Sequence, residues 1–231
     1  MILSEATALS KTEVRWGLDD AVCVVAFLIM ISMSLFAYSE SGIFNYEVNT
    51  GLFCGVACLF PLILKHLRVM TLSVWFNVMI AITIFIHANG VLMMSYDTLV
   101  FYDTLTHTAA SITVAMCVFY TLMCYHVYTG GKVDFAGRFM PLMITLIMLG
   151  FSAYWEVFEF VADMMWNTGM QYSPFDTIRD TICNTFGASL VTMCASRYLK
   201  KHSPEEIVAS FNLHPRLTKF ISDPFSNEDK E

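Results

Sequence analysis

Acidic side chains, a histidine and an asparagine recur at helical spacing in three apolar segments of the chain. Each segment holds a pair three or four residues apart, and such pairs lie on one face of an α-helix. The pairs are Asp103 and His107, Glu156 and Glu159, and Asp180 and Asn184. Carboxylate oxygens suit Mg²⁺ and Mn²⁺, whereas an added imidazole also admits Zn²⁺ or Fe²⁺. The spacing therefore predicts three polar helix faces that could supply ligands to a divalent metal.

Ionised side chains inside an apolar run are costly, which makes these residues candidates for function. Glu156 lies 17 residues after Phe139, hence roughly 26 Å along a helix and still within the hydrocarbon of a bilayer. The residues that we expect to be catalytic are Glu156, Glu159 and Asp180. The predicted metal ligands are the same three acids together with Asp103 and His107.

Further polar residues near these segments are candidates for binding a substrate. They are His87, Asp163, Asp176, Arg179 and Asn184. A structural role stays open for two of them. Asp176 fits the start of a helix in which Ser173 is the N-cap and Pro174 the first residue. Asp163 lies near the end of its apolar run, where water can hydrate it.

Six apolar runs approach or exceed the roughly 20 residues that a helix needs to cross a bilayer. They are residues 21–38, 48–64, 72–94, 105–125, 139–166 and 176–199. Of the 231 residues, 56% are hydrophobic and 14% charged, and the mean hydropathy is +0.58, which is too apolar for an ordinary soluble domain. The expected fold is an all-α, polytopic integral membrane bundle of six transmembrane helices over residues 1–199. A polar cytoplasmic tail is expected over residues 200–231.

The positions of lysine and arginine predict the orientation of these helices, because cytoplasmic loops are rich in both residues. The cations precede the first run and lie in alternate connections, at Lys11, Arg15, Lys65, Arg68, Lys132, Arg138, Arg197, Lys200 and Lys201. The remaining connections carry none. Both termini are therefore expected in the cytoplasm, in a plasma or inner membrane. All the acids named above then fall in the outer half of the bilayer.

Composition and local pattern exclude several classes of protein and site. A formal net charge of -7 leaves no basic surface for phosphates, so nucleic acid is not an expected partner. The seven cysteines all fall in apolar runs and predict no disulfide framework. Small residues at Gly187, Ala188 and Ser189 predict a close approach by a neighbouring helix.

Three short motifs resemble those of the VanZ-like membrane family, and most closely its uncharacterised YjdF-type relatives. The motifs are D-x-x-x-H at Asp103, W-E-x-x-E at Trp155 and D-x-x-x-N-x-x-G at Asp180, and the resemblance covers about residues 85–195. It implies that Asp103, His107, Glu156, Glu159, Asp180 and Asn184 form the polar cluster of the family. It implies no reaction, since family members are linked at most to glycopeptide-antibiotic resistance at the cell envelope. Where that family tends to have glutamine, this chain has Glu159, and the extra acid favours a bound cation.

Three functions stay open on the sequence. The first is a membrane enzyme that uses Mg, Mn, Zn or Fe to act on a membrane lipid or lipid-linked envelope molecule. The second is a carrier whose acids bind a proton, a metal ion or a cationic solute, and the third is a non-catalytic partner in envelope assembly. The inner halves of the last three runs offer few polar residues beyond Thr121, Thr145 and Thr192, which favours a one-sided site over a carrier. The sequence does not indicate an oligomeric state.

Overall fold

The computed structural model describes residues 14–132, 134–166, 169–171 and 173–223. Within these residues the secondary structure consists of helices and no strand. They are α2 (Leu18–Ser41), α3 (Tyr46–Cys58), α4 (Phe60–His66), α5 (Val74–Leu92), α6 (Ser95–Thr98), α7 (Tyr102–Tyr128), α8 (Met140–Trp166), α9 (Pro174–Tyr198), α10 (Pro204–Ala209) and α11 (Pro215–Ser222). The all-helical prediction is therefore confirmed for the described chain.

Five segments are long and apolar enough to cross a membrane. They are α2, α3 together with α4, α5, α7 and most of α8. The predicted second span is interrupted at Leu59, where Pro61 stands in the first turn of α4 and cannot donate a backbone hydrogen bond. The predicted sixth span forms α9, a helix of 25 residues. It is not among the five segments apolar enough to cross a membrane, because it carries four charged residues, Asp176, Arg179, Asp180 and Arg197.

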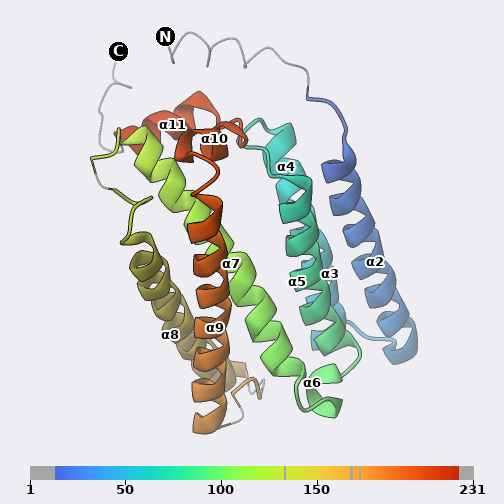
Figure 1. Cartoon of the computed structure of the whole chain (residues 1–231). Helices are drawn as coiled ribbons and strands as arrows, with labels where there is room; N and C mark the ends of the chain where they lie inside the picture. The colour runs from blue at the N-terminus through green and yellow to red at the C-terminus, as the bar shows by residue number, and fades with distance from the viewer. Residues whose placement is uncertain (1–13, 133, 167–168, 172, 224–231) are drawn as a thin grey trace.

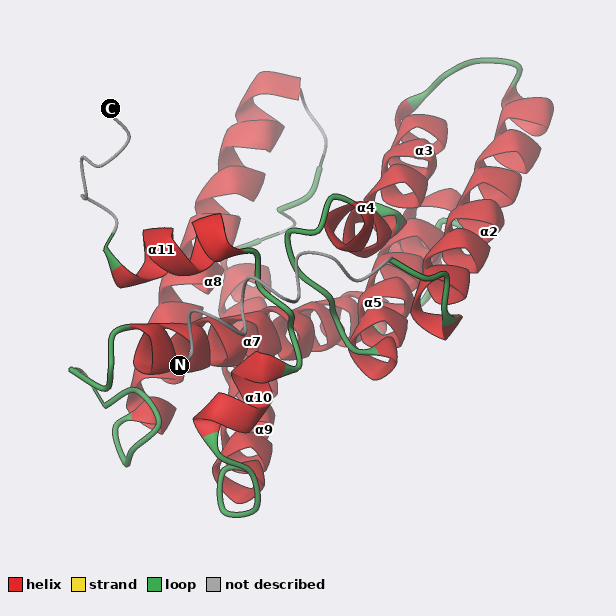
Figure 2. Ribbon diagram, turned by 90° about the horizontal axis from the view of Figure 1, so that it is seen from above, coloured by secondary structure: helices red, strands yellow, loops and turns green. Residues whose placement is uncertain are grey.

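The long helices run side by side in two packed groups (Figures 1 and 2). Helices α2, α3 and α5 pack together, α9 packs against both α7 and α8, and α5 contacts α7 to join the two groups. The helix α6 lies at one end of the bundle, and α4, α10 and α11 lie at the other (Figure 1). Consequently α7 and α9 begin at the α6 end, and α8 ends there.

The buried face of α8 changes character along its length. Buried side chains recur every three or four residues, in the order Met140, Ile144, Met148, Ser152, Glu156, Glu159 and Ala162. The first three contribute to the main apolar core, and the next three are polar. The helices α7 and α9 show the same change, with buried polar residues near the α6 end and apolar ones beyond. The buried acidic residues of this helix group therefore all lie toward the α6 end.

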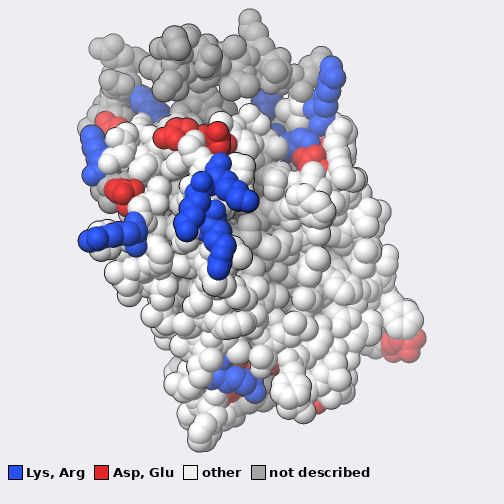
Figure 3. Space-filling view, viewed as in Figure 1, with Lys and Arg blue, Asp and Glu red and all other residues white. Residues whose placement is uncertain are grey.

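The end of the bundle opposite α6 carries most of the charge (Figure 3). There Lys65 of α4 contacts Asp19 Oδ2 at 2.6 Å and Asp20 Oδ2 at 2.5 Å. The segment predicted as a polar tail begins at this end, but its first part is packed on the bundle. Ile207, Val208 and Phe211 are buried in the main core. Lys11, one of the cations behind the predicted orientation, and the last eight residues of the tail (224–231) lie outside the described residues.

The helix α9 approaches α7 closely at Gly187, as the small residues predict. A Cβ atom at Gly187 would lie 2.9 Å from the Cβ of Ser111 and 3.0 Å from the backbone oxygen of Thr108. Ala188 is fully buried, whereas Ser189 is exposed and bonds to its own helix. The first two positions of the predicted small-residue stretch are therefore at the contact, and the third is not.

We expect Gly187→Ala to lower the free energy of unfolding by about 1–3 kcal/mol, because the added methyl group pushes α9 away from α7. The measurement is reversible unfolding in detergent, followed by circular dichroism. Gly150→Ala on α8 is the matched control, since a Cβ there meets nothing within 4 Å. Alanine at that position should leave stability unchanged or raise it by up to about 1 kcal/mol. Equal stability of the two variants would contradict close packing at Gly187.

Candidate metal centre

The predicted polar faces meet at the α6 end of the bundle. Helix α7 contributes the first turns of its length, α8 its last turns and α9 its first turns, so three helix segments distant in sequence share one region (Figure 1). Helix α9 starts where the sequence predicted. Ser173 is its N-cap and accepts a hydrogen bond from the backbone N–H of Asp176, with Pro174 as the first residue. This fixed start sets which side of α9 faces α7 and α8.

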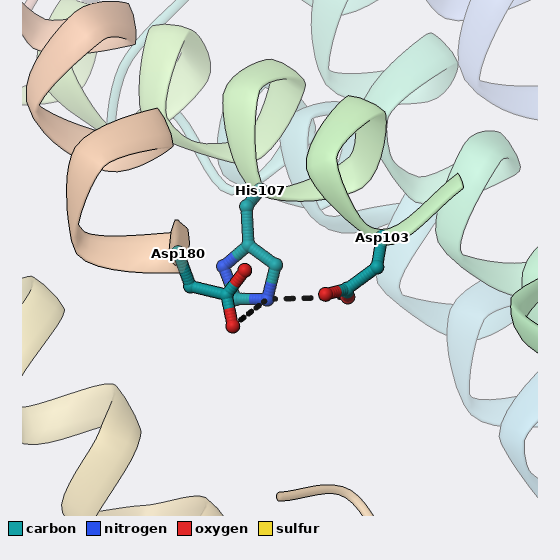
Figure 4. Close-up of side chains that lie close together, drawn as sticks. All are labelled: Asp103, His107 and Asp180. Carbon is teal, nitrogen blue, oxygen red and sulfur yellow. Dashed lines mark ion pairs between the residues drawn. The ribbon is translucent and has the colours of Figure 1, made fainter. Parts of the chain in front are cut away.

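Asp103, His107 and Asp180 point toward one another (Figure 4). His107 Nε2 lies 3.5 Å from Asp103 Oδ1 and 3.8 Å from Asp180 Oδ2. These separations are at or beyond the limit of a direct hydrogen bond. One ligand atom from each of the three residues lies within 4.8 Å of the others. The three side chains therefore lie close together, and His107 makes no short hydrogen bond to either aspartate.

A second group of potential ligands consists of Glu156, Glu159 and Asp180. Each offers a carboxylate oxygen within 4.8 Å of the other two, and all three residues are buried. Glu156 is only 7% exposed, and neither of its carboxylate oxygens has a hydrogen-bond partner among the described residues. The Thr177 side chain lies within reach of the Glu156 carboxylate, but at a geometry short of a standard hydrogen bond. A buried carboxylate without a hydrogen-bond partner is costly, so a proton or a cation at this position would stabilise Glu156.

Arg179 is the cation that the described residues bring to these acids. Its Nη2 lies 2.7 Å from Asp103 Oδ2 and also contacts Asp176, which is one helical turn away. Its Nε lies 3.7 Å from Asp180 Oδ1. Because 43% of the Arg179 side chain is exposed, the cluster reaches the surface here. The predicted substrate-binding residues Asp176 and Arg179 thus form an ion pair beside the potential metal ligands.

Asn184 ties the three helices together just beyond Asp180. Its Oδ1 accepts a hydrogen bond of 2.5 Å from Ser111 of α7, and its Nδ2 donates one of 2.8 Å to Ser152 of α8. Asn184 is a substrate-binding candidate from the sequence, whereas neither serine stands out there. A single serine in an apolar helix gives no signal of its own, because many bond to their own backbone. In this structure Asn184 holds the helices that carry the acids.

Trp155 belongs to the W-E-x-x-E motif, and the structure gives it a contact with the site. Its indole Nε1–H donates a hydrogen bond of 2.7 Å to Glu159 Oε1. The two residues are four apart on α8, so one helix turn sets the geometry. This bond holds one oxygen of Glu159 in a defined direction.

Two of the predicted substrate-binding residues bond to neighbouring structure. His87 Nδ1 lies 2.9 Å from the hydroxyl of Tyr96 in α6, and burial raises the pKa of that phenol above its usual value. Asp163 accepts hydrogen bonds from the backbone N–H groups of Met170 and Gln171, at 2.8 and 2.9 Å. His87 thus supports the corner between α5 and α7, and Asp163 supports the connection from α8 to α9.

The donor sets of the two ligand groups fit different metals. Three carboxylates suit Mg²⁺ or Mn²⁺, and two carboxylates with an imidazole suit Zn²⁺ or Fe²⁺ as well. Asp103 already contacts Arg179 through one oxygen, whereas neither oxygen of Glu156 has a hydrogen-bond partner among the described residues. The group of Glu156, Glu159 and Asp180 is therefore the better candidate for a metal.

We expect Asn184→Ala to destabilise the protein by about 1–3 kcal/mol, because the Ser111 and Ser152 hydroxyls each lose a buried partner. Detergent unfolding monitored by circular dichroism measures the change. Ser189→Ala is the control, since that exposed hydroxyl bonds only to the Thr185 backbone oxygen, and it should stay within about 0.5 kcal/mol of the parent protein. A similar small effect for both variants would show that Asn184 does not hold the three helices.

The comparisons with known proteins identify a family for this chain. Residues 20–201 match the family described as "Predicted membrane protein (DUF2238)". No curated protein and no solved structure matches the chain. The matched region includes every residue of both ligand groups, and the family description agrees with the five membrane-length helices. The chain is therefore a multi-pass membrane protein that belongs to this family.

Proposed function

We propose that the protein is a membrane-embedded metalloenzyme that binds a divalent cation through Glu156, Glu159 and Asp180. Its substrate is a lipid or lipid-linked molecule of the envelope, reached from the outer leaflet. In this proposal α9 is a sixth transmembrane helix and both termini lie in the cytoplasm. The membrane is the plasma membrane or an inner membrane. The observation that carries it is the buried carboxylate of Glu156, which has no hydrogen-bond partner among the described residues.

The distribution of cations supports the proposed orientation. The helix ends next to α4, α10 and α11 carry Lys65, Arg138, Arg197 and Lys200, whereas the opposite end carries Arg179. Cytoplasmic ends of membrane helices are the ones rich in lysine and arginine. A sixth span by α9 is supported by its length and by its packing between α7 and α8. Its acids face the interior, where a membrane helix can carry them.

The surroundings of the cluster support a lipid substrate. Helices α8 and α9 bury their acids and expose large apolar side chains, among them Val157, Phe158, Ile178 and Ile182. In a bilayer these would contact acyl chains. Arg179 and Asp103 reach the end of the bundle, with 43% and 18% of their side chains exposed. A head group at the membrane surface could therefore approach the cluster while its lipid tails stay beside α8 and α9.

The chemistry of the proposed site follows from its donors. A bound divalent cation polarises a phosphoryl or carbonyl oxygen and lowers the pKa of a bound water molecule. Among the proposed ligands, Glu159 has a carboxylate whose direction is fixed by the hydrogen bond from Trp155. Arg179 is the candidate for contacting an anionic head group. Asn184 positions the ligands by holding α7 and α8 on α9.

A carrier that uses the same acids remains the alternative, and so does an assembly partner. A carrier needs a polar path through the membrane, but the buried residues beyond the acids are mostly apolar, including Met148, Ile144 and Val191. The buried polar atoms there are few, Thr192 Oγ1 and His126 Nδ1 among them. The hydroxyl of Thr145 bonds to its own helix. The one-sided placement of the buried acids favours a site that is used from the outer leaflet. The resemblance to the VanZ-like family and its YjdF-type relatives is compatible with this role at the envelope and does not specify a reaction.

We expect the purified wild-type protein to contain a divalent metal and Glu156→Gln to lose at least about tenfold in affinity for Mn²⁺. Elemental analysis and titration calorimetry in detergent measure the two quantities. Glu205→Gln is the matched control, because this exposed glutamate lies at the opposite end of the bundle. Its affinity should equal that of the wild type.

Absence of metal from the wild-type protein, even after incubation with Mg²⁺, Mn²⁺ and Zn²⁺, would refute the metalloenzyme. Flux of protons or cations in liposomes would then become the relevant assay. If metal binds, lipid phosphates and lipid esters are the substrates to try first. Turnover that Glu205→Gln retains and Glu156→Gln loses would support an enzyme, whereas metal binding without turnover of either class would favour a binding protein.

A further inference from the structure

We propose that the centre holds two divalent cations and that Asp180 bridges them. This inference rests on the proposed function, which needs only one cation. The two ligand groups at the site have Asp180 in common. Helix α9, which carries Asp180, packs against α7 on one side and α8 on the other. One carboxylate therefore faces an Asp-x-x-x-His pair on α7 and a Glu-x-x-Glu pair on α8.

The first cation position is on the α8 side of the site, at a buried carboxylate. Glu156 is 7% exposed, its two oxygens have no hydrogen-bond partner among the described residues, and it lies within the ligand group of Glu159 and Asp180. The first cation therefore takes three carboxylates. This donor set suits Mg²⁺ or Mn²⁺.

The α7 side has the spacing of ligands around a second ion. His107 Nε2 lies 3.5 Å from Asp103 Oδ1 and 3.8 Å from Asp180 Oδ2, as Figure 4 shows. Ligands about 2.1 Å from a tetrahedral metal are about 3.4 Å from one another, so little movement is needed to close these gaps. Arg179 contacts the other oxygen of Asp103, Oδ2, at 2.7 Å. Asp103 can therefore keep its arginine and still present Oδ1 to an ion.

Asp180 is the residue that makes the two positions interdependent. It is 1% exposed, and its Oδ1 has no hydrogen-bond partner among the described residues. Oδ2 is the oxygen nearest His107, so the two oxygens can serve different ions. A bridging carboxylate holds two cations a few ångströms apart, the spacing at which such pairs clamp phosphoryl groups.

The net negative charge of the cluster also favours more than one divalent cation. Five carboxylates gather here, on Asp103, Glu156, Glu159, Asp176 and Asp180, against the single guanidinium of Arg179. If all are ionised, four negative charges remain, and one divalent cation offsets only half of them. A second divalent cation brings the buried cluster to neutrality, which removes most of the cost of burying it. The ligand class that this pair fits is a phosphate or pyrophosphate group on a lipid.

The test is the number of Mn²⁺ ions bound by the full-length protein in detergent, together with its electron paramagnetic resonance spectrum. We expect two ions per wild-type chain, with magnetic coupling that suppresses the signal of isolated Mn²⁺. His107→Gln and Glu156→Gln should each leave one uncoupled ion. Asp180→Asn should lose both ions or bind them far more weakly, and Glu205→Gln should retain two.

A single uncoupled ion in the wild type, lost in Glu156→Gln and kept in His107→Gln, would overturn the two-cation centre and leave the proposed function intact. Absence of any ion would refute both. Gel filtration and circular dichroism show whether each variant is folded. If the His107 variant does not fold, the stoichiometry and spectral coupling of the wild-type protein decide the question by themselves.

Discussion

The burial of carboxylates among α7, α8 and α9 is the constraint on which the arrangement of these helices depends. Removing an ionised acid from water costs several kcal/mol unless an opposite charge or hydrogen bonds replace the water. Arg179 supplies one charge and Trp155 one hydrogen bond. Both oxygens of Glu156 have no hydrogen-bond partner among the described residues, and Asp180 Oδ1 has only the guanidinium of Arg179 near it, at 3.7 Å. Any stable state of the protein must therefore neutralise these groups with bound cations or protons.

The turns of α9 that follow Asp180 hold α7 and α8 close to the acidic cluster. Gly187 lets α9 approach the α7 backbone closely, and Asn184 joins α9 to Ser111 and Ser152 through buried hydrogen bonds. Asp180, Asn184 and Gly187 follow one another at intervals of four and three residues, so they share one face of α9. The candidate metal ligand Asp180, the hydrogen-bonded Asn184 and the close contact at Gly187 thus occupy successive turns of one helix.

Much of this arrangement could be predicted from the sequence, because helical spacing is a local property. The three pairs of polar residues, the start of α9 at Ser173 and the close contact at Gly187 follow from short-range patterns. Partners across helices could not be predicted in the same way. Nothing local in the sequence links Ser111 and Ser152 to Asn184, or His87 to Tyr96. The packing of Ile207 and Phe211 on the core was likewise hidden in a segment whose overall composition is polar.

The two most deeply buried aspartates, Asp20 and Asp180, differ in how their carboxylates are satisfied. Each is 1% exposed. Asp20 accepts hydrogen bonds from Lys65 Nζ and the backbone N–H of Gly17, and its second oxygen lies 3.1 Å from His66 Nε2. The chain thus fully satisfies a buried acid where that acid only joins α2 to α4. It leaves Asp180 Oδ1 and both oxygens of Glu156 without hydrogen-bond partners among the described residues, which is the arrangement expected of groups that bind a ligand.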